Sequence, residues 1–318
     1  MEGPVRRKIR QRVRERAGLR LPELPQGPID SGGRARTDSL AAAARPAAPW
    51  LLVLPGGGGT GLGMAALTGL WERGPAAGFA AVFPDGFGHV WNDQRNAPRL
   101  KRREGIDDVA FLRALVERLA ADGVADADAV FGVGISNGSL MSEHLARQSL
   151  LPVRGLALVA GPATSATRAA SAVPAHPAEV VMFHGTADPI VPYAGGPIRP
   201  LGGLGSRGDA ERRAGRGGVA PVETVAADWA TANGCPPEPV VETLPVSAGD
   251  LPVTRFTWTA PGHPAVVLHR IEGGGHTWPG GEQYLPPRLV GTVARLDATG
   301  IVLERFSACA GLEPPGPR

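Results

Sequence analysis

The chain has 318 residues, a formal net charge of +3 and a hydrophobic content of 43%, which fits one large globular domain or two small ones. Eight basic and two acidic side chains lie in residues 1–20, so the remaining residues carry a net charge of −3. A general nucleic-acid-binding surface is therefore not indicated, and no apolar run has the length of a membrane span.

Residues 1–30 form a basic leader that contains prolines. Val5, Ile9 and Val13 recur every four residues, which would allow a short amphipathic helix at a membrane surface; a solvated tail is the alternative. No apolar stretch of the secretory kind follows the basic residues, so no export signal is visible and a cytoplasmic location stays open.

Apolar strands and helices alternate from Trp50 onward. Six segments are interpreted as buried strands: 50–55, 79–86, 129–135, 155–161, 179–185 and 265–275. Five segments are interpreted as helices: 64–73, 105–123, 139–150, 222–232 and 293–308. Strands that are apolar along their whole length, separated by helices, predict an α/β fold with a mostly parallel sheet and helices on both faces.

Ser136 lies between one such strand and the next helix, within "GISNG". A sharp turn there would expose the hydroxyl, the flanking glycines would relieve backbone clashes, and the helix start would point an N–H at a developing oxyanion. This is the G-x-S-x-G pattern of a nucleophilic serine. A plain turn residue or helix cap is the alternative interpretation.

A carboxylate and an imidazole follow the serine in the order that such a site requires. Asp188, in "HGTADPIVP", comes just after a strand, where it could orient an imidazole; a turn or capping role is the alternative. His276 lies in the glycine-rich loop "EGGGHTWPGG" after the last strand. His263, in a turn, and His269, within a strand, are weaker candidates.

The loop "PGGGGTG" after the first strand would let backbone amides approach a reacting carbonyl. We expect one oxyanion donor from Gly57, with Gly56 as the near second, and the other from the N–H of Asn137. A phosphate-binding loop is the rival interpretation, but no Gly-Lys-Ser/Thr follows. Asp85 lies near the position of the acidic residue in dinucleotide-binding folds, so that alternative stays open at this point.

With these residues together, the chain resembles the polyhydroxybutyrate-depolymerase-type esterases, relatives of the feruloyl and acetylxylan esterases. The resemblance runs from about Ile29 to Ala310 and rests on "VFPDG", "WNDQR", "DDVAFL", "GISNG", "HGTADPIVPYAGG", "ANGC", "GGGHTWPGG" and "DATGIVLERF". It implies an α/β-hydrolase fold with Ser136, Asp188 and His276 as the catalytic triad. Because such relatives are usually exported, it also implies an extracellular location.

The chain departs from the family pattern at two positions. Ser139 stands where relatives tend to have glycine, and Pro55 stands where they usually have histidine. Neither departure removes a catalytic group, but Pro55 lies in the expected oxyanion loop and could change its shape.

The implied activity is two-step hydrolysis of carboxylic esters through an acyl-enzyme, with no metal or organic cofactor. Short hydroxyalkanoate oligomers or related small esters are the expected substrates, and a feruloyl- or acetylxylan-type carbohydrate esterase is the alternative. A third hypothesis is a non-catalytic protein of this fold whose basic tail binds membrane or nucleic acid. Trp91 and Trp278 are expected to line the substrate pocket, with a buried core role as the alternative.

We expect a single catalytic domain over residues 31–312, after the leader over 1–30 and before a flexible tail over 313–318. The glycine- and arginine-rich stretch 195–220 predicts a surface loop, which either borders the active site or is simply solvated.

Two cysteines allow at most one internal disulfide. A bond between Cys235 and Cys309 would tie the C-terminal helix to the region before the last strands. Two reduced thiols are the alternative.

Overall fold

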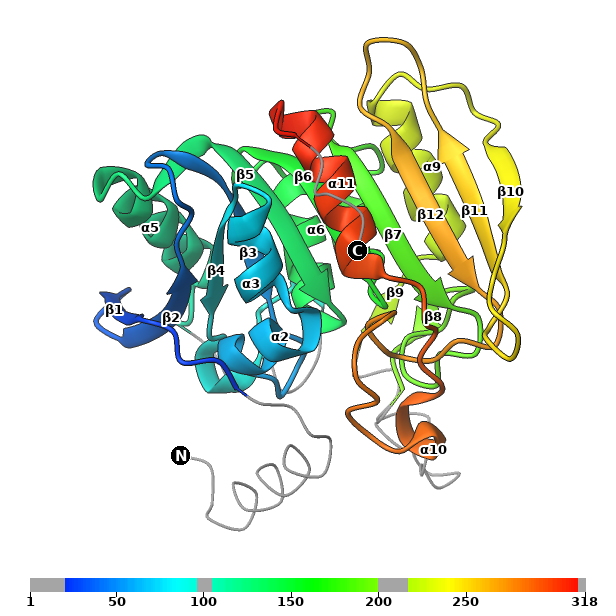
Figure 1. Ribbon diagram of the computed structural model, residues 1–318, viewed down its shortest axis with the longest axis horizontal. Helices are drawn as coiled ribbons and strands as arrows, with labels where there is room; N and C mark the ends of the chain where they lie inside the picture. The colour runs from blue at the N-terminus through cyan, green and yellow to red at the C-terminus, as the bar shows by residue number, and fades with distance from the viewer. Residues whose placement is uncertain (1–20, 96–104, 200–216, 314–318) are drawn as a thin grey trace.

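A ten-stranded sheet runs through the described part of the chain, which in this computed structural model comprises residues 21–95, 105–199 and 217–313 (Figure 1). In their order across the sheet, the strands are β1 (Gln26–Asp30), β2 (Ala35–Ala41), β4 (Ala80–Pro84), β3 (Ala48–Leu54), β5 (Ala125–Ile135), β6 (Val153–Val159), β7 (Glu179–Gly185), β12 (Val266–Ile271), β11 (Val253–Trp258) and β10 (Val240–Leu244).

The six central strands, from β4 to β12, are parallel to one another, and each edge adds two antiparallel strands. These six are the six strands that the apolar runs predict, so the α/β fold with a mostly parallel sheet is confirmed. The pattern misses the four edge strands, because β1, β2, β10 and β11 mix polar and apolar residues and lack a continuous buried run.

Helices cover both faces of the sheet (Figure 1). They are α2 (Gly61–Thr68), α3 (Leu70–Ala76), α5 (Asp108–Ala121), α6 (Asn137–Arg147), α7 (Ser165–Ala170), α9 (Val222–Ala232), α10 (Pro287–Val290) and α11 (Ala298–Ala310). The helix expected over 64–73 is in fact two, because Gly69 adopts a left-handed conformation (φ 65°) that ends α2. The Asp107 carboxylate caps α5 by accepting a hydrogen bond from the Ala110 N–H at 2.9 Å.

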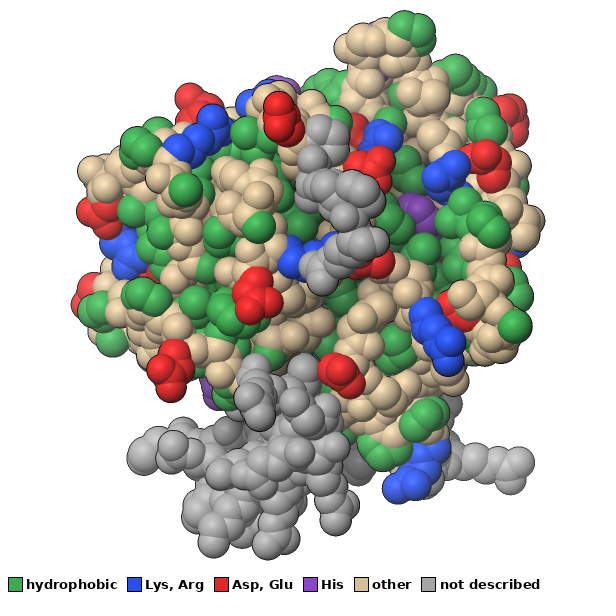
Figure 2. Space-filling model, viewed as in Figure 1, with side chains coloured by type: hydrophobic (Ala, Val, Ile, Leu, Met, Phe, Trp, Pro, Cys, Tyr) green, Lys and Arg blue, Asp and Glu red, His purple; other side chains and the backbone are tan. Residues whose placement is uncertain are grey.

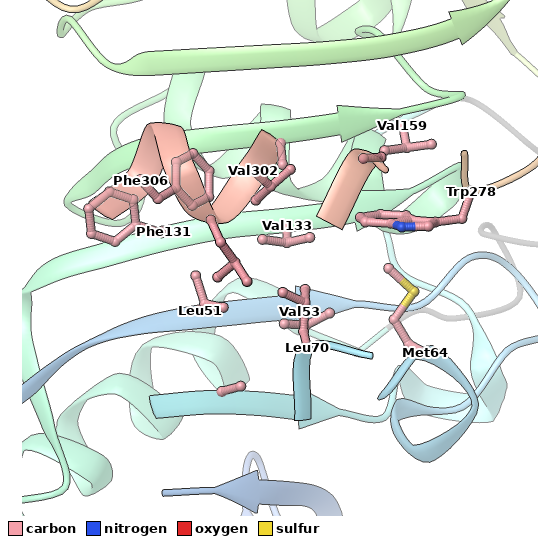
Figure 3. Packing of buried hydrophobic residues seen from close by; sticks show 14 of the residues in the cluster. Leu51, Val53, Met64, Leu70, Phe131, Val133, Val159, Trp278, Val302 and Phe306 are labelled. Atoms are coloured by element: carbon pink, nitrogen blue, oxygen red, sulfur yellow. The ribbon is translucent and has the colours of Figure 1, made fainter. Parts of the chain in front are cut away.

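Successive residues of the central strands pack against opposite helix layers. In β3, Leu51 and Val53 contact the layer formed by α2, α3 and α11, whereas Leu52 and Leu54 contact the layer that contains α5. Figure 3 shows the first layer, in which Val302 and Phe306 of α11 lie against the sheet. Burial of both strand faces explains why these strands are apolar throughout.

The chain order makes the carboxyl ends of β3 and β5 a topological switch point of the sheet. From β3 the chain crosses to β4 on one side, and it then returns to β5 on the other side of β3. Where the strand order reverses in this way, the two loops after the strands diverge, and open α/β sheets bind ligands at that point. The loop after β3 is the glycine-rich one, and the residue after β5 is Ser136.

The boundary of the leader needs correction. Residues 26–30 form β1, which pairs antiparallel with β2 from Gln26–Ser39 to Asp30–Ala35, so the folded unit begins before residue 31. Residues 1–20, including the apolar positions that would allow a helix, lie outside the described residues.

The ends of the stretch 195–220 form a small two-stranded ribbon. Its strands are β8 (Gly196–Pro197) and β9 (Gly218–Val219). The segment between them, 200–216, lies outside the described residues, as does 314–318 of the C-terminal tail.

The disulfide proposed between Cys235 and Cys309 is not formed. Cys309, on α11, packs against the same layer as Phe306, whereas Cys235 packs with the residues around Trp229 on the opposite face of the sheet. Each sulfur instead lies near a backbone carbonyl, that of Pro264 for Cys235 (3.6 Å) and that of Arg154 for Cys309 (3.9 Å). The sheet therefore separates the two thiols.

The surface drawn in Figure 2 carries acidic and basic side chains interspersed, without a large patch of one sign. In the part of the chain that the structure describes, no helix has the length and apolar character needed to cross a bilayer.

Candidate active site

Ser136 occupies the sharp turn between β5 and α6. Its backbone has φ 56° and ψ −122°, a conformation that residues with a side chain rarely adopt. The residues on both sides, 129–135 and 137–147, are buried, whereas Ser136 is partly exposed. A strained, solvent-reaching serine at such a turn is the geometry expected of a nucleophile elbow.

The two flanking glycines are required by backbone contacts. A Cβ on Gly134 would lie 2.4 Å from the carbonyl carbon of Gly138, and one on Gly138 would lie 2.1 Å from the Leu54 oxygen. No side chain fits at either position, so the glycines allow α6 to start directly against the ends of β3 and β5. Ser139, one of the two departures from the family pattern, donates its hydroxyl hydrogen bond to the Gly161 carbonyl.

Asp188 and His276 meet across the ends of neighbouring strands. The loop after β7 carries Asp188, the loop after β12 carries His276, and these two strands are parallel neighbours. Nδ1 of His276 lies 2.7 Å from Oδ2 of Asp188, and both residues are about 95% buried (5% and 4% exposed). The other carboxylate oxygen, Oδ1, accepts hydrogen bonds from the N–H groups of Ile190 and Val191, each at 2.8 Å.

The environment of Asp188 favours its ionised form. Burial alone raises the pKa of this carboxyl, but His276, the nearby His184 and the backbone N–H of Ile190 outweigh burial and hold the pKa below its usual value. A buried carboxylate in this state can hold an imidazole in one orientation and stabilise its protonated form.

Ser136 lies at the same edge of the sheet as this pair. The strands β5, β6, β7 and β12 are consecutive neighbours, and all are parallel, so the loops after them meet at one edge. The structure thus brings Asp188 and His276 into contact, while the Ser136 hydroxyl makes no hydrogen bond to any described residue. Catalytic contacts of this kind often tighten only when substrate binds.

The glycine-rich loop after β3 lies directly beside the elbow. A Cβ on Gly56 would lie 3.4 Å from Cβ of Ser136, and one on Gly57 would lie 3.6 Å from Cβ of Asn137. The N–H groups of Gly58 and Gly59 are already used, in bonds to the carbonyls of His89 and Gly56. Within the described residues, the N–H groups of Gly57 and Asn137 donate to no acceptor.

Both tryptophans expected to line the pocket belong instead to the core. Trp278 is 1% exposed, lies between Val159 and Met64 (Figure 3), and donates its indole N–H to Thr299 Oγ1 at 3.0 Å. Trp91 is fully buried and stacks on Phe111. The structure therefore corrects the expectation that these two rings line the substrate pocket. A large aromatic ring buries more apolar area when it packs beneath the wall of a site than when it lies on the surface of that site.

The remaining candidates from the sequence have structural roles. His269 is buried on β12 against Phe183, and burial lowers its pKa to about 4, while His263 is exposed in a turn. The carboxylate of Asp85, the residue that left a dinucleotide-binding fold open, accepts a hydrogen bond from the first residue of α2, Gly61, at 2.8 Å.

Two further groups beside the site are not singled out by any sequence pattern. His184 Nε2 lies 2.9 Å from the Val191 carbonyl and 3.6 Å from Asp188 Oδ2, and burial lowers the pKa of this imidazole. Asp93 is fully buried and accepts a hydrogen bond from the Asn137 side chain at 2.7 Å. Their motifs, "HGTAD" and "WNDQR", mark both segments, but only the fold shows what these side chains contact.

Comparison with known proteins agrees with this fold. The chain is 32% identical over 249 residues to "Putative esterase NocK" of Nocardia uniformis subsp. tsuyamanensis, across 78% of this chain and 70% of that protein. The acetyl xylan esterase from Aspergillus awamori has a similar structure, with a TM-score of 0.52 at 14% identity over 80% of this chain and 94% of the other. A ferulic acid esterase matches 44% of this chain and 60% of its own with a TM-score of 0.34 at 15% identity, too low to support an argument. No protein-family model matches the chain.

The strand order, the two helix layers and the similarity to the acetyl xylan esterase structure define an α/β-hydrolase fold. The chain belongs to the family that includes the putative esterase NocK.

Proposed function

We propose that the protein is a serine esterase that hydrolyses carboxylic esters through an acyl-enzyme. Ser136 is the nucleophile, His276 is the general base and then the general acid, and Asp188 orients and stabilises the imidazole. The observation that carries the proposal is the buried Asp188–His276 pair at the sheet edge where the strained Ser136 turn also lies.

The reaction needs no group beyond these side chains and the backbone. His276 takes the Ser136 proton as the oxygen attacks the ester carbonyl, and the alcohol leaves with that proton. Water then attacks the acyl-enzyme, again with His276 as base, and the acid is released. The N–H groups of Gly57 and Asn137 hold the tetrahedral oxyanion in both steps.

The class of ester is inferred from the sequence motifs that resemble those of polyhydroxybutyrate-depolymerase-type esterases. We propose short hydroxyalkanoate oligomers or related small esters. The similarity in structure to an acetyl xylan esterase keeps acetylated carbohydrates as the alternative, although at 14% identity that similarity concerns the fold.

One panel assay tests activity and substrate class together. Wild type and Ser136→Ala are compared on p-nitrophenyl acetate and butyrate, hydroxybutyrate dimers and trimers, methyl ferulate and acetylated xylan. We expect Ser136-dependent hydrolysis of the p-nitrophenyl esters, with the highest kcat/KM among natural esters on the hydroxybutyrate oligomers. Higher values on acetylated xylan or methyl ferulate would assign the carbohydrate-esterase alternative.

A truncated chain separates catalysis from a binding role of the basic segment. A protein that starts at residue 21 keeps β1 and the whole described fold. We expect its kcat/KM to equal that of the full chain. Absence of Ser136-dependent hydrolysis, together with salt-sensitive vesicle or nucleic-acid binding that needs residues 1–20, would support the non-catalytic hypothesis instead.

A further inference from the structure

Trp91 makes hydrogen bonds to both segments that supply the oxyanion donors. Its indole N–H donates to the carbonyl of Pro55, the first residue of the glycine-rich loop, at 3.1 Å. Its backbone N–H donates to Oδ1 of Asn137 at 2.7 Å, and its backbone carbonyl accepts from Nδ2 of Asn137 at 3.1 Å. One fully buried residue therefore joins the loop after β3 to the turn after β5.

The side chain of Asn137 is held at every polar atom. Besides the two bonds with Trp91, Nδ2 donates to Oδ2 of Asp93 at 2.7 Å. The Oδ2 atom also lies 2.9 Å from Nε of Arg95, so the buried carboxylate has a cation beside it. With one acceptor and two donor hydrogens in use, the Asn137 amide has a single orientation available.

This fixed orientation matters because Asn137 is also the residue whose backbone N–H is the proposed oxyanion donor. Donors of this kind work only when they are held at hydrogen-bond distance from the charge that develops in the transition state. A slack of about 1 Å at such a site is enough to lose most of the benefit. Through its rigid side chain, Trp91 restrains the Pro55 end of the loop that carries Gly57. Through its backbone, it restrains Asn137, the first residue of α6.

We propose that Trp91 is a positioning residue of the oxyanion hole, which sets the distance between the Gly57 and Asn137 N–H groups. The proposal rests on the function proposed above. It assigns Trp91 a role other than the substrate contact expected from the sequence. The residue acts through the groups that it holds, and it affects the transition state more than substrate binding.

A second buried tryptophan of the same core layer provides a matched control. Trp50, on β3, is also fully buried and packs in the same cluster as Trp91. Its indole N–H donates to a backbone carbonyl, that of Asp126, at the same distance of 3.1 Å. Trp50→Phe therefore removes an equivalent hydrogen bond near the starts of β3 and β5, whereas the elbow lies at the opposite ends of these strands.

The test compares Trp91→Phe with Trp50→Phe in the full chain. We expect Trp91→Phe to lower kcat on p-nitrophenyl butyrate by about 10- to 100-fold with KM within about twofold. Its affinity for a trifluoromethyl ketone, which forms a tetrahedral adduct with the serine, should fall by a similar factor. Trp50→Phe should lower the melting temperature comparably but leave kcat and inhibitor affinity within about twofold.

Asn137→Ala serves as the second variant in case Trp91→Phe does not fold. It keeps the backbone N–H but removes the side chain that Trp91 and Asp93 hold, and it should show the same loss of kcat with little change in KM. Equal effects of Trp91→Phe and Trp50→Phe on kcat would overturn the proposal, as would unimpaired kcat in Trp91→Phe or, where that variant does not fold, in Asn137→Ala. Wild-type protein without Ser136-dependent hydrolysis would contradict the proposed function itself, and the positioning role with it.

Discussion

The imidazole of His276 lies 2.7 Å from the carboxylate of Asp188, although 88 residues separate them in the chain. The contact exists because β7 and β12 are parallel neighbours in the sheet, with His184 opposite Arg270 and Gly185 opposite Ile271. The whole of β10 and β11 is inserted between these two strands in sequence but lies beyond them in space.

Replacing Asp188 with asparagine should remove the charge that stabilises the imidazolium while keeping the side-chain volume. We expect kcat of Asp188→Asn to fall by about 1,000- to 10,000-fold with a small change in KM. Steady-state kinetics on p-nitrophenyl butyrate measures both constants. Asp122→Asn, at an exposed carboxylate at the end of α5, should behave as wild type; a similar loss in both variants would argue against a special role for Asp188.

The same carboxylate should make the fold sensitive to acid. The pKa of Asp188 is lower in the folded protein than its ordinary value of 3.8, so the folded state holds the ionised form more tightly than the unfolded state does. Its contribution to the free energy of unfolding is therefore full above about pH 4 and is lost as the pH falls through the folded-state pKa. Melting temperatures of wild type and Asp188→Asn, measured from pH 7 to pH 3, should differ less and less toward the acid end. A difference that stays constant over this range would contradict the assignment.

Gly138 and Gly57 should differ in their tolerance of a methyl group. In Gly138→Ala the new Cβ would meet the Leu54 carbonyl oxygen at 2.1 Å, and backbone atoms cannot move aside as a flexible side chain does. We expect a loss of about 1–3 kcal/mol in the free energy of unfolding, measured by urea denaturation. In Gly57→Ala the nearest atom lies at 3.6 Å, an ordinary contact, so stability should change by less than about 0.5 kcal/mol.

The two cysteines should titrate as free thiols. Because they pack on opposite faces of the sheet, we expect two reactive thiols per chain when the protein is denatured without reductant and treated with a thiol reagent. The melting temperature should be the same with and without reductant. A single fast-migrating oxidised species that disappears in Cys235→Ser would show instead that the bond forms.

Sequence patterns predict the features of this protein that arise from continuous burial along a segment. They do not predict the features that depend on how distant segments pack together. The strands that carry the site are buried on both faces, and that burial leaves a continuous apolar run which can be recognised without a structure. Edge strands such as β10, which is exposed over most of its length, leave no such run and were missed. Likewise, the sequence shows that Trp91 and Trp278 lie near the candidate residues in the chain. Whether the two rings are buried or exposed depends on how the helix layers pack against the sheet.

The sequence alone determined the alternation of strands and helices, the glycine-flanked serine and the chain order of serine, carboxylate and imidazole, because each is a local pattern of residue type. Only the tertiary structure decided that Asp188 and His276 touch, that the sheet keeps Cys235 and Cys309 apart, and that Trp91 joins the glycine-rich loop to Asn137. These contacts join residues tens of positions apart in the chain, and their geometry is set by strand order and layer packing, which no local pattern encodes.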